Sequence, residues 1–442
     1  MPRLFGTDGI RGVANRDLTP DLALALGRAA GSVLAPGGGE MVIGRDTRIS
    51  GPMLEGALVA GLCSAGVTVR TAGIVPSPAV AFLTIDERAR AGGVISASHN
   101  PAPDNGIKFF SEAGVKISAG AEEEIEALMA EPPAARPEGT DVGGSEPLAQ
   151  AVDRYVDHLL GSLEHSLSGL RVVVDCAFGA AWHVGPRAFR EAGADVTAIN
   201  AEADGSRINA GSGSTDLTVL AARVRSEGAD LGIAFDGDAD RALAVDETGA
   251  VIDGDRIIAM LALQMYEQET LDKNIVIATV MANLGFRRAL SAHGIEVVSC
   301  PVGDKYVGEA MRDHGAVLGG EQSGHVIFGH HSTTGDGVLT GLKVAELVRT
   351  SDRPLSMMAE VFESYPQVLI NVRVGKKERL DDAQGLWDRV AKLEASLGDE
   401  GRVLLRASGT EPLVRVMVEA ADKQVARQAA EDLARAVERE LS

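Results

Sequence analysis

Cysteine, positive charge and long apolar runs are all scarce in this chain of 442 residues. The three cysteines, Cys63, Cys176 and Cys300, are too few and too far apart for a disulfide framework or a Cys-x-x-Cys metal site. No apolar run approaches the roughly 20 residues that cross a bilayer. The formal net charge of −21 argues against nucleic acid or an anionic membrane as partner, because either needs a broad basic face.

These absences predict a soluble protein in which any anion-binding site is a local basic pocket. The N-terminal residues Met1 to Gly9 lack the apolar core of a secretory signal, so we expect a cytoplasmic location. Glycine is abundant instead: it supplies 52 of the 442 residues, which is well above the usual share of about 7%. We therefore expect many loops in which the backbone comes close to a neighbour.

The pattern of the chain predicts three α/β units followed by a smaller α+β domain. Thr19-Pro20 is typical of a helix start, and a helical pattern over residues 120–130 precedes a Pro/Gly/Glu-rich stretch, 131–146, that we interpret as a linker. Strand-like runs that alternate with helical patterns favour parallel sheets flanked by helices. We place the domain boundaries at 1–150, 151–252, 253–364 and 365–442.

The alternation is clearest in the second and third units. The expected strands are residues 171–175, 196–199, 231–235, 275–280, 297–300 and 317–318, and the expected helices are 180–192, 217–226, 284–293 and 305–313. The last domain has expected strands at 368–374, 403–406 and 413–419 before a final amphipathic helix. Functional loops should follow the carboxyl ends of the parallel strands.

A polar loop with a serine-histidine pair lies between the apolar runs of residues 92–110. It offers a nucleophile, hydrogen-bonding groups and a positive charge, which together suit a phosphate; the residues are Ser98, His99, Asn100, Asp104, Asn105 and Lys108. Neither serine of the loop lies in a Gly-x-Ser-x-Gly elbow, so ordinary esterase chemistry is not expected. The residues alone do not choose between Ser96 and Ser98 as the nucleophile.

Three carboxylates, Asp236, Asp238 and Asp240, lie within five residues between two apolar strands. Their repulsion is costly without a cation, and hard oxygen ligands suit Mg²⁺ or Ca²⁺ better than zinc. An EF-hand is excluded because Arg241 stands where that loop needs glycine and because strands flank it. The alternatives are a Mg²⁺ site that keeps a position for a phosphate oxygen, and a solvated acidic turn.

Two further loops carry polar groups that could bind a substrate. Gly319 to His325 imitates the glycine spacing of a nucleotide-binding P-loop but lacks its Lys-Ser/Thr, so Glu321, Ser323 and His325 could contact a sugar or form a polar turn. Residues 406–415 combine two arginines with two hydroxyls, which makes either an anion cradle or an ordinary charged hairpin.

Taken together and in this order, the four loops resemble those of the α-D-phosphohexomutase family over essentially the whole chain. Phe5 to Gly12 and Gly320 to His325 resemble the branch that acts on glucosamine phosphates. The resemblance implies three related α/β domains with mixed sheets and a smaller C-terminal α+β domain around a central cleft. It also implies that Ser98, within the motif of residues 96–101, carries a phosphoryl group.

The implied reaction interconverts glucosamine 6-phosphate and glucosamine 1-phosphate through phospho-Ser98 and a bisphosphate that turns around in the cleft. Its product would feed UDP-N-acetylglucosamine and cell-wall synthesis. The resemblance implies one Mg²⁺ per active site, bound by Ser98, Asp236, Asp238 and Asp240, and an activating phosphorylation of Ser98. Arg241 would offset charge, and Lys108, His99 or His325 would move a proton. The implied substrate contacts are Glu321, Ser323, His325, Arg406, Ser408, Gly409, Thr410 and Arg415.

Several alternatives remain open from the sequence. A phosphomannomutase or phosphoglucomutase would use the same catalytic loops and differ in the loop of residues 321–325. A phosphoserine phosphatase would have no use for a second phosphate cradle, and a non-catalytic sugar-phosphate sensor would not need the nucleophile or the metal ligands. An exposed apolar patch would permit a homodimer, but the sequence does not show which face is exposed.

Overall fold

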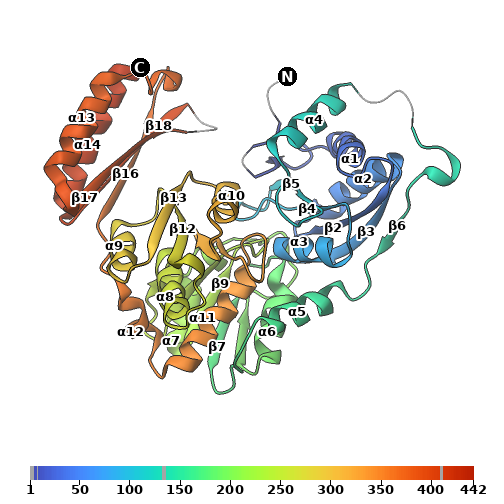
Figure 1. Cartoon of the computed structure of the whole chain (residues 1–442). Coiled ribbons are helices and arrows are strands. Elements are labelled where there is room, and N and C mark those ends of the chain that lie inside the picture. The colour runs from blue at the N-terminus through green and yellow to red at the C-terminus, as the bar shows by residue number, and fades with distance from the viewer. Residues whose placement is uncertain (1–3, 7, 132–135, 409–411) are drawn as a thin grey trace. The chain divides into compact units, whose positions relative to one another are not determined.

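The computed structural model describes residues 4–6, 8–131, 136–408 and 412–442, which divide into two compact units. The larger unit comprises Met1–Thr279 and Val298–Ala359, and the smaller comprises Val280–Val297 and Glu360–Ser442. Each unit has its own sheets and core (Figure 1). Among the described residues, no helix combines the length and apolar character needed to cross a bilayer.

The first sheet of the larger unit has the strand order β1-β5-β4-β2-β3-β6. Its strands are β1 (Ile10–Val13), β2 (Gly39–Arg45), β3 (Val67–Ile74), β4 (Ala91–Ile95), β5 (Asp104–Ser111) and β6 (Ser145–Pro147). Strands β2, β3, β4 and β6 are parallel, whereas β5 runs antiparallel to both β4 and β1. The expected linker is therefore shorter than predicted, because its last residues pair with β3 as β6.

Alternating side chains of this sheet enter two layers of helices. Met41 and Ile43 of β2 join a core with α1 (Pro20–Leu34), α2 (Gly51–Ser64) and α4 (Ala119–Ala130). A Cβ placed on Gly44 or Gly92 would instead strike Val80 of α3 (Ser77–Asp86), so the other face contacts α3 (Figure 1). The helix start at Thr19 is confirmed, since its side chain accepts a hydrogen bond from the Leu22 N–H.

The second sheet follows the order β11-β10-β9-β7-β8. Strands β7 (Arg171–Asp175), β8 (Asp195–Ile199) and β9 (Leu231–Phe235) are parallel, as the alternation predicts. Strands β10 (Ala242–Asp246) and β11 (Val251–Ile252) extend the sheet antiparallel. The helices of this region are α5 (Ala151–Gly161), α6 (Ala181–Glu191) and α7 (Thr218–Glu227), the last two of which match expected helices.

The third sheet has the order β13-β12-β14-β15. Its strands are β12 (Ile275–Thr279), β13 (Glu296–Cys300), β14 (Leu318–Gly320) and β15 (Val326–Phe328), with β12 parallel to β14 and β15 antiparallel to it. The larger unit also contains α8 (Gly254–Glu267), α10 (Asp304–His314), α11 (Gly337–Ser351) and α12 (Leu355–Met358). The three sheets are thus mixed, and each parallel set has one antiparallel neighbour, which is β5, β10 or β15.

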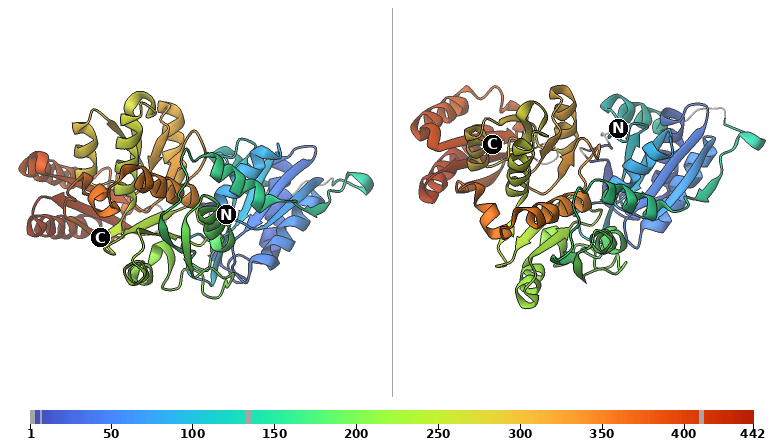
Figure 2. Two further views of the ribbon diagram at one scale, coloured as in Figure 1. Left: turned by 90° about the horizontal axis from the view of Figure 1, so that it is seen from below. Right: turned by 60° about the horizontal axis from the view of Figure 1, so that its bottom comes forward.

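The smaller unit contains an antiparallel sheet of order β16-β18-β17. Its elements are β16 (Gln367–Arg373), β17 (Gly401–Ala407), β18 (Leu413–Ala420), α13 (Gln384–Leu397) and α14 (Lys423–Leu441), together with α9 (Leu284–Ala292) from earlier in the chain. Helices α13 and α14 lie side by side against this sheet, where they share one apolar core with it (Figure 2). The fold-class prediction, α/β with mixed sheets and a small C-terminal α+β domain, is confirmed.

Candidate active site

The loop between β4 and β5 holds Ser98 in an unusual backbone conformation. Ser98 has φ +51°, in the left-handed region that residues other than glycine rarely adopt, and it is 1% exposed. Its Oγ donates a hydrogen bond to Asp236 Oδ2 at 2.7 Å and lies 3.4 Å from His99 Nδ1. Ser96 points elsewhere, with its Oγ donating to Asp46 Oδ2 at 2.5 Å and accepting from the Ser98 N–H at 2.9 Å. The structure therefore separates the two serines.

The acidic loop follows β9 and is buried throughout. Asp236, Asp238 and Asp240 are 0%, 1% and 4% exposed, and one carboxylate oxygen from each lies within 4.8 Å of the others. Asp238 Oδ1 and Asp240 Oδ1 are buried, yet they accept no hydrogen bond from any residue that the structure describes. Buried oxygens left without donors fit a divalent cation, since hard oxygen ligands are what Mg²⁺ and Ca²⁺ bind. The solvated acidic turn does not describe this loop.

Two basic side chains border the three carboxylates. The Lys108 Nζ lies 2.9 Å from Asp238 Oδ2 and 3.3 Å from Asp240 Oδ2, and Arg241 Nε lies 3.8 Å from Asp240 Oδ1. Burial and the repulsion of its two neighbours raise the pKa of Asp236 well above its usual range. Burial opposes the charge of Lys108, but the neighbouring carboxylates outweigh it and raise the pKa of Lys108 well above the ordinary value.

A second, partly buried group of charged side chains lies beside this cluster. The Lys116 Nζ lies 2.5 Å from Asp8 Oδ1 and 2.5 Å from Asp304 Oδ2. Burial favours a neutral Asp8, yet Lys116 and Lys108 together hold the pKa of that carboxyl well below its usual range. Ion pairs of Lys108 and Lys116 thus link Asp8 of the N-terminal loop to the acidic loop and to Asp304 at the start of α10.

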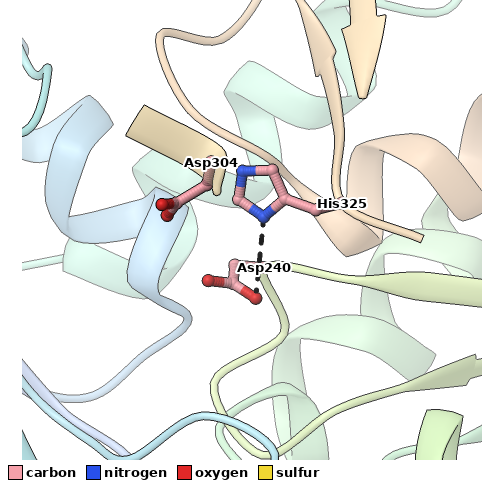
Figure 3. Close-up of side chains that lie close together, drawn as sticks. All are labelled: Asp240, Asp304 and His325. Atoms are coloured by element: carbon pink, nitrogen blue, oxygen red, sulfur yellow. Dashed lines mark ion pairs between the residues drawn. The ribbon is translucent and has the colours of Figure 1, made fainter. Parts of the chain in front are cut away.

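His325 faces Asp240 of the acidic loop (Figure 3). The ring is 1% exposed, its Nδ1 lies 3.9 Å from Asp240 Oδ1, and its Nε2 accepts a hydrogen bond from the Gly335 N–H at 3.0 Å. Burial disfavours the imidazolium, but Asp240 more than compensates and raises the pKa of His325. Both ring nitrogens contact the protein, which suits positioning of Asp240. With Asp304, these residues form a second group close enough to hold a cation.

The neighbouring residues of the same loop differ in exposure. Glu321 is 9% exposed and its Oε1 accepts a hydrogen bond from the Gly303 N–H at 3.1 Å, whereas Ser323 is exposed. The loop of residues 321–325 contacts the end of the acidic loop, where the Ala242 N–H donates to the Gly324 carbonyl at 3.0 Å. Sequence-distant loops with Ser98, Asp236 to Arg241 and Glu321 to His325 thus lie together in the larger unit.

The predicted phosphate cradle is in the smaller unit. Arg406 of β17 lies directly opposite Arg415 of β18 in the antiparallel register. Ser408 is buried, and its N–H donates to the Leu413 carbonyl at 2.9 Å. Gly409 and Thr410, the other two predicted contacts, lie outside the described residues. The two arginines therefore leave adjacent strands at the same level of one hairpin.

Several residues that organise the larger unit's site were not singled out from the sequence. Arg48 and Asp46 are both 0% exposed and pair at 2.9 Å, with Arg48 bonded to carbonyls of the Ser98 loop, and Asn209 reaches the same loop from the connection between β8 and α7. Asp8 and Lys116 form the ion pair described above. The available signal was the apolar run of residues 41–43, which is typical of a strand, with Arg45-Asp-Thr-Arg48 close after it, where functional loops are expected.

Four domain models of phosphoglucomutase/phosphomannomutase match this chain in succession. They are α/β/α domain I at residues 2–136, domain II at 153–249, domain III at 253–365 and the C-terminal domain at 369–436. The chain belongs to this family. The resemblance of the four loops is therefore confirmed, and the larger unit of this phosphohexomutase contains its serine, acidic and Glu321 to His325 loops.

Curated relatives match over the full length. A protein from Nocardioides is 54% identical over 448 residues and one from Clavibacter sepedonicus is 51% identical over 449, each covering all of both chains; both are named phosphoglucosamine mutase. Among solved structures, a phosphoglucomutase/phosphomannomutase family protein from Burkholderia thailandensis matches with TM-score 0.83 and 27% identity, covering 98% of this chain and 97% of that one. A phosphohexomutase activity follows from these likenesses.

Proposed function

We propose that this phosphohexomutase interconverts glucosamine 6-phosphate and glucosamine 1-phosphate through a phosphoserine at Ser98. The observation that carries the proposal is the position of the Ser98 Oγ, 2.7 Å from Asp236 in a buried group of three carboxylates. The choice of an amino sugar is supported by the name of the full-length relatives, which are 51–54% identical to this chain. The product would feed UDP-N-acetylglucosamine synthesis in the cytoplasm.

Mg²⁺ is the cation proposed for the acidic loop, held by Asp236, Asp238 and Asp240 together with the phosphoryl group on Ser98. These ligands are hard oxygens in a buried site, and two of the carboxylate oxygens have no hydrogen-bond donor among the described residues. When bound, the ion supplies charge stabilisation for the oxygens of the transferring phosphoryl group. Arg241, with its pKa raised by the same carboxylates, stays cationic and adds to that stabilisation.

The proposed transfer moves the phosphoryl group from Ser98 Oγ to the O1 hydroxyl of glucosamine 6-phosphate, and the hydroxyl proton passes to a base. Burial lowers the pKa of His99, which keeps a neutral ring 3.4 Å from Ser98 Oγ and suits that base. Lys108 stays protonated beside Asp238 and Asp240 and suits the acid that returns a proton to the serine oxygen. The bisphosphate then turns around, so that its 6-phosphate returns to Ser98.

We assign recognition of the sugar and binding of the phosphate that does not react to two separate loops. Glu321 and Ser323 are proposed to contact the sugar, with His325 orienting Asp240. The phosphate that does not react is proposed to bind Arg406, Ser408, Gly409, Thr410 and Arg415. Each guanidinium group can donate two parallel hydrogen bonds to two oxygens of one phosphate. The domain boundaries at 150, 252 and 364 and a homodimer remain predictions.

The proposal is tested by turnover of purified protein on glucosamine, glucose and mannose 6-phosphates with Mg²⁺ and a trace of hexose 1,6-bisphosphate. We expect the glucosamine substrate to turn over fastest, and Ser98→Ala to abolish turnover on all three. Ser118→Ala, at an exposed helix N-cap, is the matched control that should keep wild-type turnover. Faster turnover of glucose or mannose phosphate would instead favour a phosphoglucomutase or phosphomannomutase.

A further inference from the structure

Arg48 contacts the Ser98 loop through a side chain that is hydrogen-bonded at all three of its nitrogens. It is wholly buried, and its Nε donates to Asp46 Oδ2 at 2.9 Å. Its Nη1 donates to the carbonyls of Pro101 and Asp104, and its Nη2 to those of Ser98 and Asn100, at distances of 2.6 to 3.0 Å. Every one of the five N–H donors of the guanidinium thus has an acceptor, and four of those acceptors are backbone atoms of one loop.

Asp46 and Ser96 complete this arrangement from the opposite side. Asp46 Oδ1 accepts from the Arg48 N–H, and its Oδ2 accepts from both Arg48 Nε and Ser96 Oγ. Ser96 Oγ in turn accepts from the Ser98 N–H. The chain of contacts Arg48, Asp46, Ser96 therefore holds the backbone of Ser98 on both its N–H side and its carbonyl side.

The connection between β8 and α7 adds a further contact to the carbonyls of Ser98 and Asn100. Asn209 Nδ2 donates to the carbonyls of Ser98 and Asn100 at 2.9 and 3.0 Å. With the Ser98 carbonyl held by Arg48 and Asn209 and its φ at +51°, the side chain is directed to the opposite side, toward Asp236. The backbone contacts thus account for a conformation that an unrestrained serine would rarely adopt.

We propose that Arg48, held by Asp46 and Ser96, is a positioning residue for phosphoryl transfer, fixing the loop of residues 98–104 so that Ser98 Oγ points into the acidic loop. The inference deepens the proposed function and rests on it for the catalytic readout. A lysine at position 48 would keep the charge but has three donors on one nitrogen, so it cannot reach four carbonyls and Asp46 together. Charge alone is therefore not sufficient.

The test compares Arg48→Lys with Arg45→Lys, a control in the same segment whose guanidinium pairs with Glu55 and donates a long hydrogen bond of 3.4 Å to the Asp46 carbonyl, and not to any carbonyl of the Ser98 loop. In Arg48→Lys we expect kcat to fall about 100-fold with KM for the sugar phosphate within about threefold, because the residue does not touch the substrate. Phosphorylation of Ser98 by hexose 1,6-bisphosphate, followed by intact-protein mass spectrometry, should slow by a similar factor.

Hydrogen exchange of the peptide covering residues 96–108 supplies a readout that does not depend on the reaction. We expect faster exchange in Arg48→Lys and wild-type exchange in Arg45→Lys. A folded Arg48→Lys with wild-type kcat and wild-type exchange would overturn the proposal. If that variant does not fold, Ser96→Ala decides in its place, with faster exchange and a lower kcat expected and no change in either overturning it. If wild-type Ser98 takes up no phosphoryl group, the phosphoserine route fails, while the exchange data still decide the role of Arg48.

Discussion

Removal of the Lys108 charge should destabilise the larger unit, and a divalent cation should reverse that loss. Lys108 lies 2.9 Å from Asp238 and 3.3 Å from Asp240, and all three side chains are buried. At an effective dielectric constant of about 20, each of these attractions is worth about 5 to 6 kcal/mol before the cost of desolvation. Because breaking a buried pair leaves uncompensated charge, we expect Lys108→Met to lower the free energy of unfolding in EDTA by about 3 to 5 kcal/mol.

The assay is hydrogen exchange of β9, whose residues Leu231–Phe235 precede the acidic loop, in EDTA and in Mg²⁺. Mg²⁺ at about 100 times the wild-type Kd should stabilise the wild-type protein by about 2.7 kcal/mol if it binds only the folded state. The same concentration should stabilise Lys108→Met by more, because its uncompensated carboxylates should bind Mg²⁺ more tightly. Lys116→Met is the control, since it breaks a partly buried ion pair with Asp8 and Asp304 instead. If Mg²⁺ rescues Lys116→Met and not Lys108→Met, our assignment of the metal to Asp236, Asp238 and Asp240 is wrong.

Three further predictions concern stability, packing and metal dependence. Burial raises the pKa of Asp336 to about 6, so the folded state binds more protons than the unfolded state between pH 4 and pH 6, and the wild-type protein loses stability as the pH rises. Asp336→Asn lacks this loss, so its free energy of unfolding, measured by urea titration, should rise by about 3 kcal/mol relative to wild type between about pH 4 and pH 7. A difference that stays constant with pH would contradict this. Gly237→Ala would place a Cβ 2.6 Å from the Ser98 carbonyl and should lower turnover at least about tenfold, whereas Gly56→Ala, with open space around it, should leave turnover unchanged. EDTA should abolish turnover and excess Mg²⁺ restore it; turnover that survives exhaustive chelation would exclude the proposed cation.

The parallel parts of the fold and the main loops could be predicted from the sequence because they depend on local patterns. The run of residues 231–235 is apolar throughout and forms β9, and the carboxylates that follow it are at the strand's carboxyl end, as expected for an α/β sheet. The antiparallel direction of strands β5, β10 and β15 was harder to predict. Alternation of strands and helices predicts parallel pairing, and each of these strands returns directly after a functional loop without an intervening helix.

The buried polar residues around the Ser98 loop could not be found in this way because burial of a charge depends on distant partners. Arginine is usually a surface residue, yet Arg48 is buried, and four of its five acceptors are carbonyls of residues 98–104, about fifty positions away. His325 was predicted as a sugar contact, and the Gly335 N–H that occupies its Nε2 lies ten residues on, in a segment without a recognisable motif. The residues alone likewise did not choose between Ser96 and Ser98; the family resemblance implied Ser98, and in the structure it is the Ser98 Oγ that donates to Asp236.

The most direct test of the central claim is transfer of a labelled phosphoryl group from Ser98 to the sugar. Enzyme carrying ³²P on Ser98, freed of excess label and mixed with glucosamine 6-phosphate and Mg²⁺ for a single turnover, should release its label as glucosamine 1,6-bisphosphate and glucosamine phosphates, with no label as inorganic phosphate. Label that stays on Ser98 while glucosamine 1-phosphate accumulates, or that leaves only as inorganic phosphate, would contradict a mutase working through this serine.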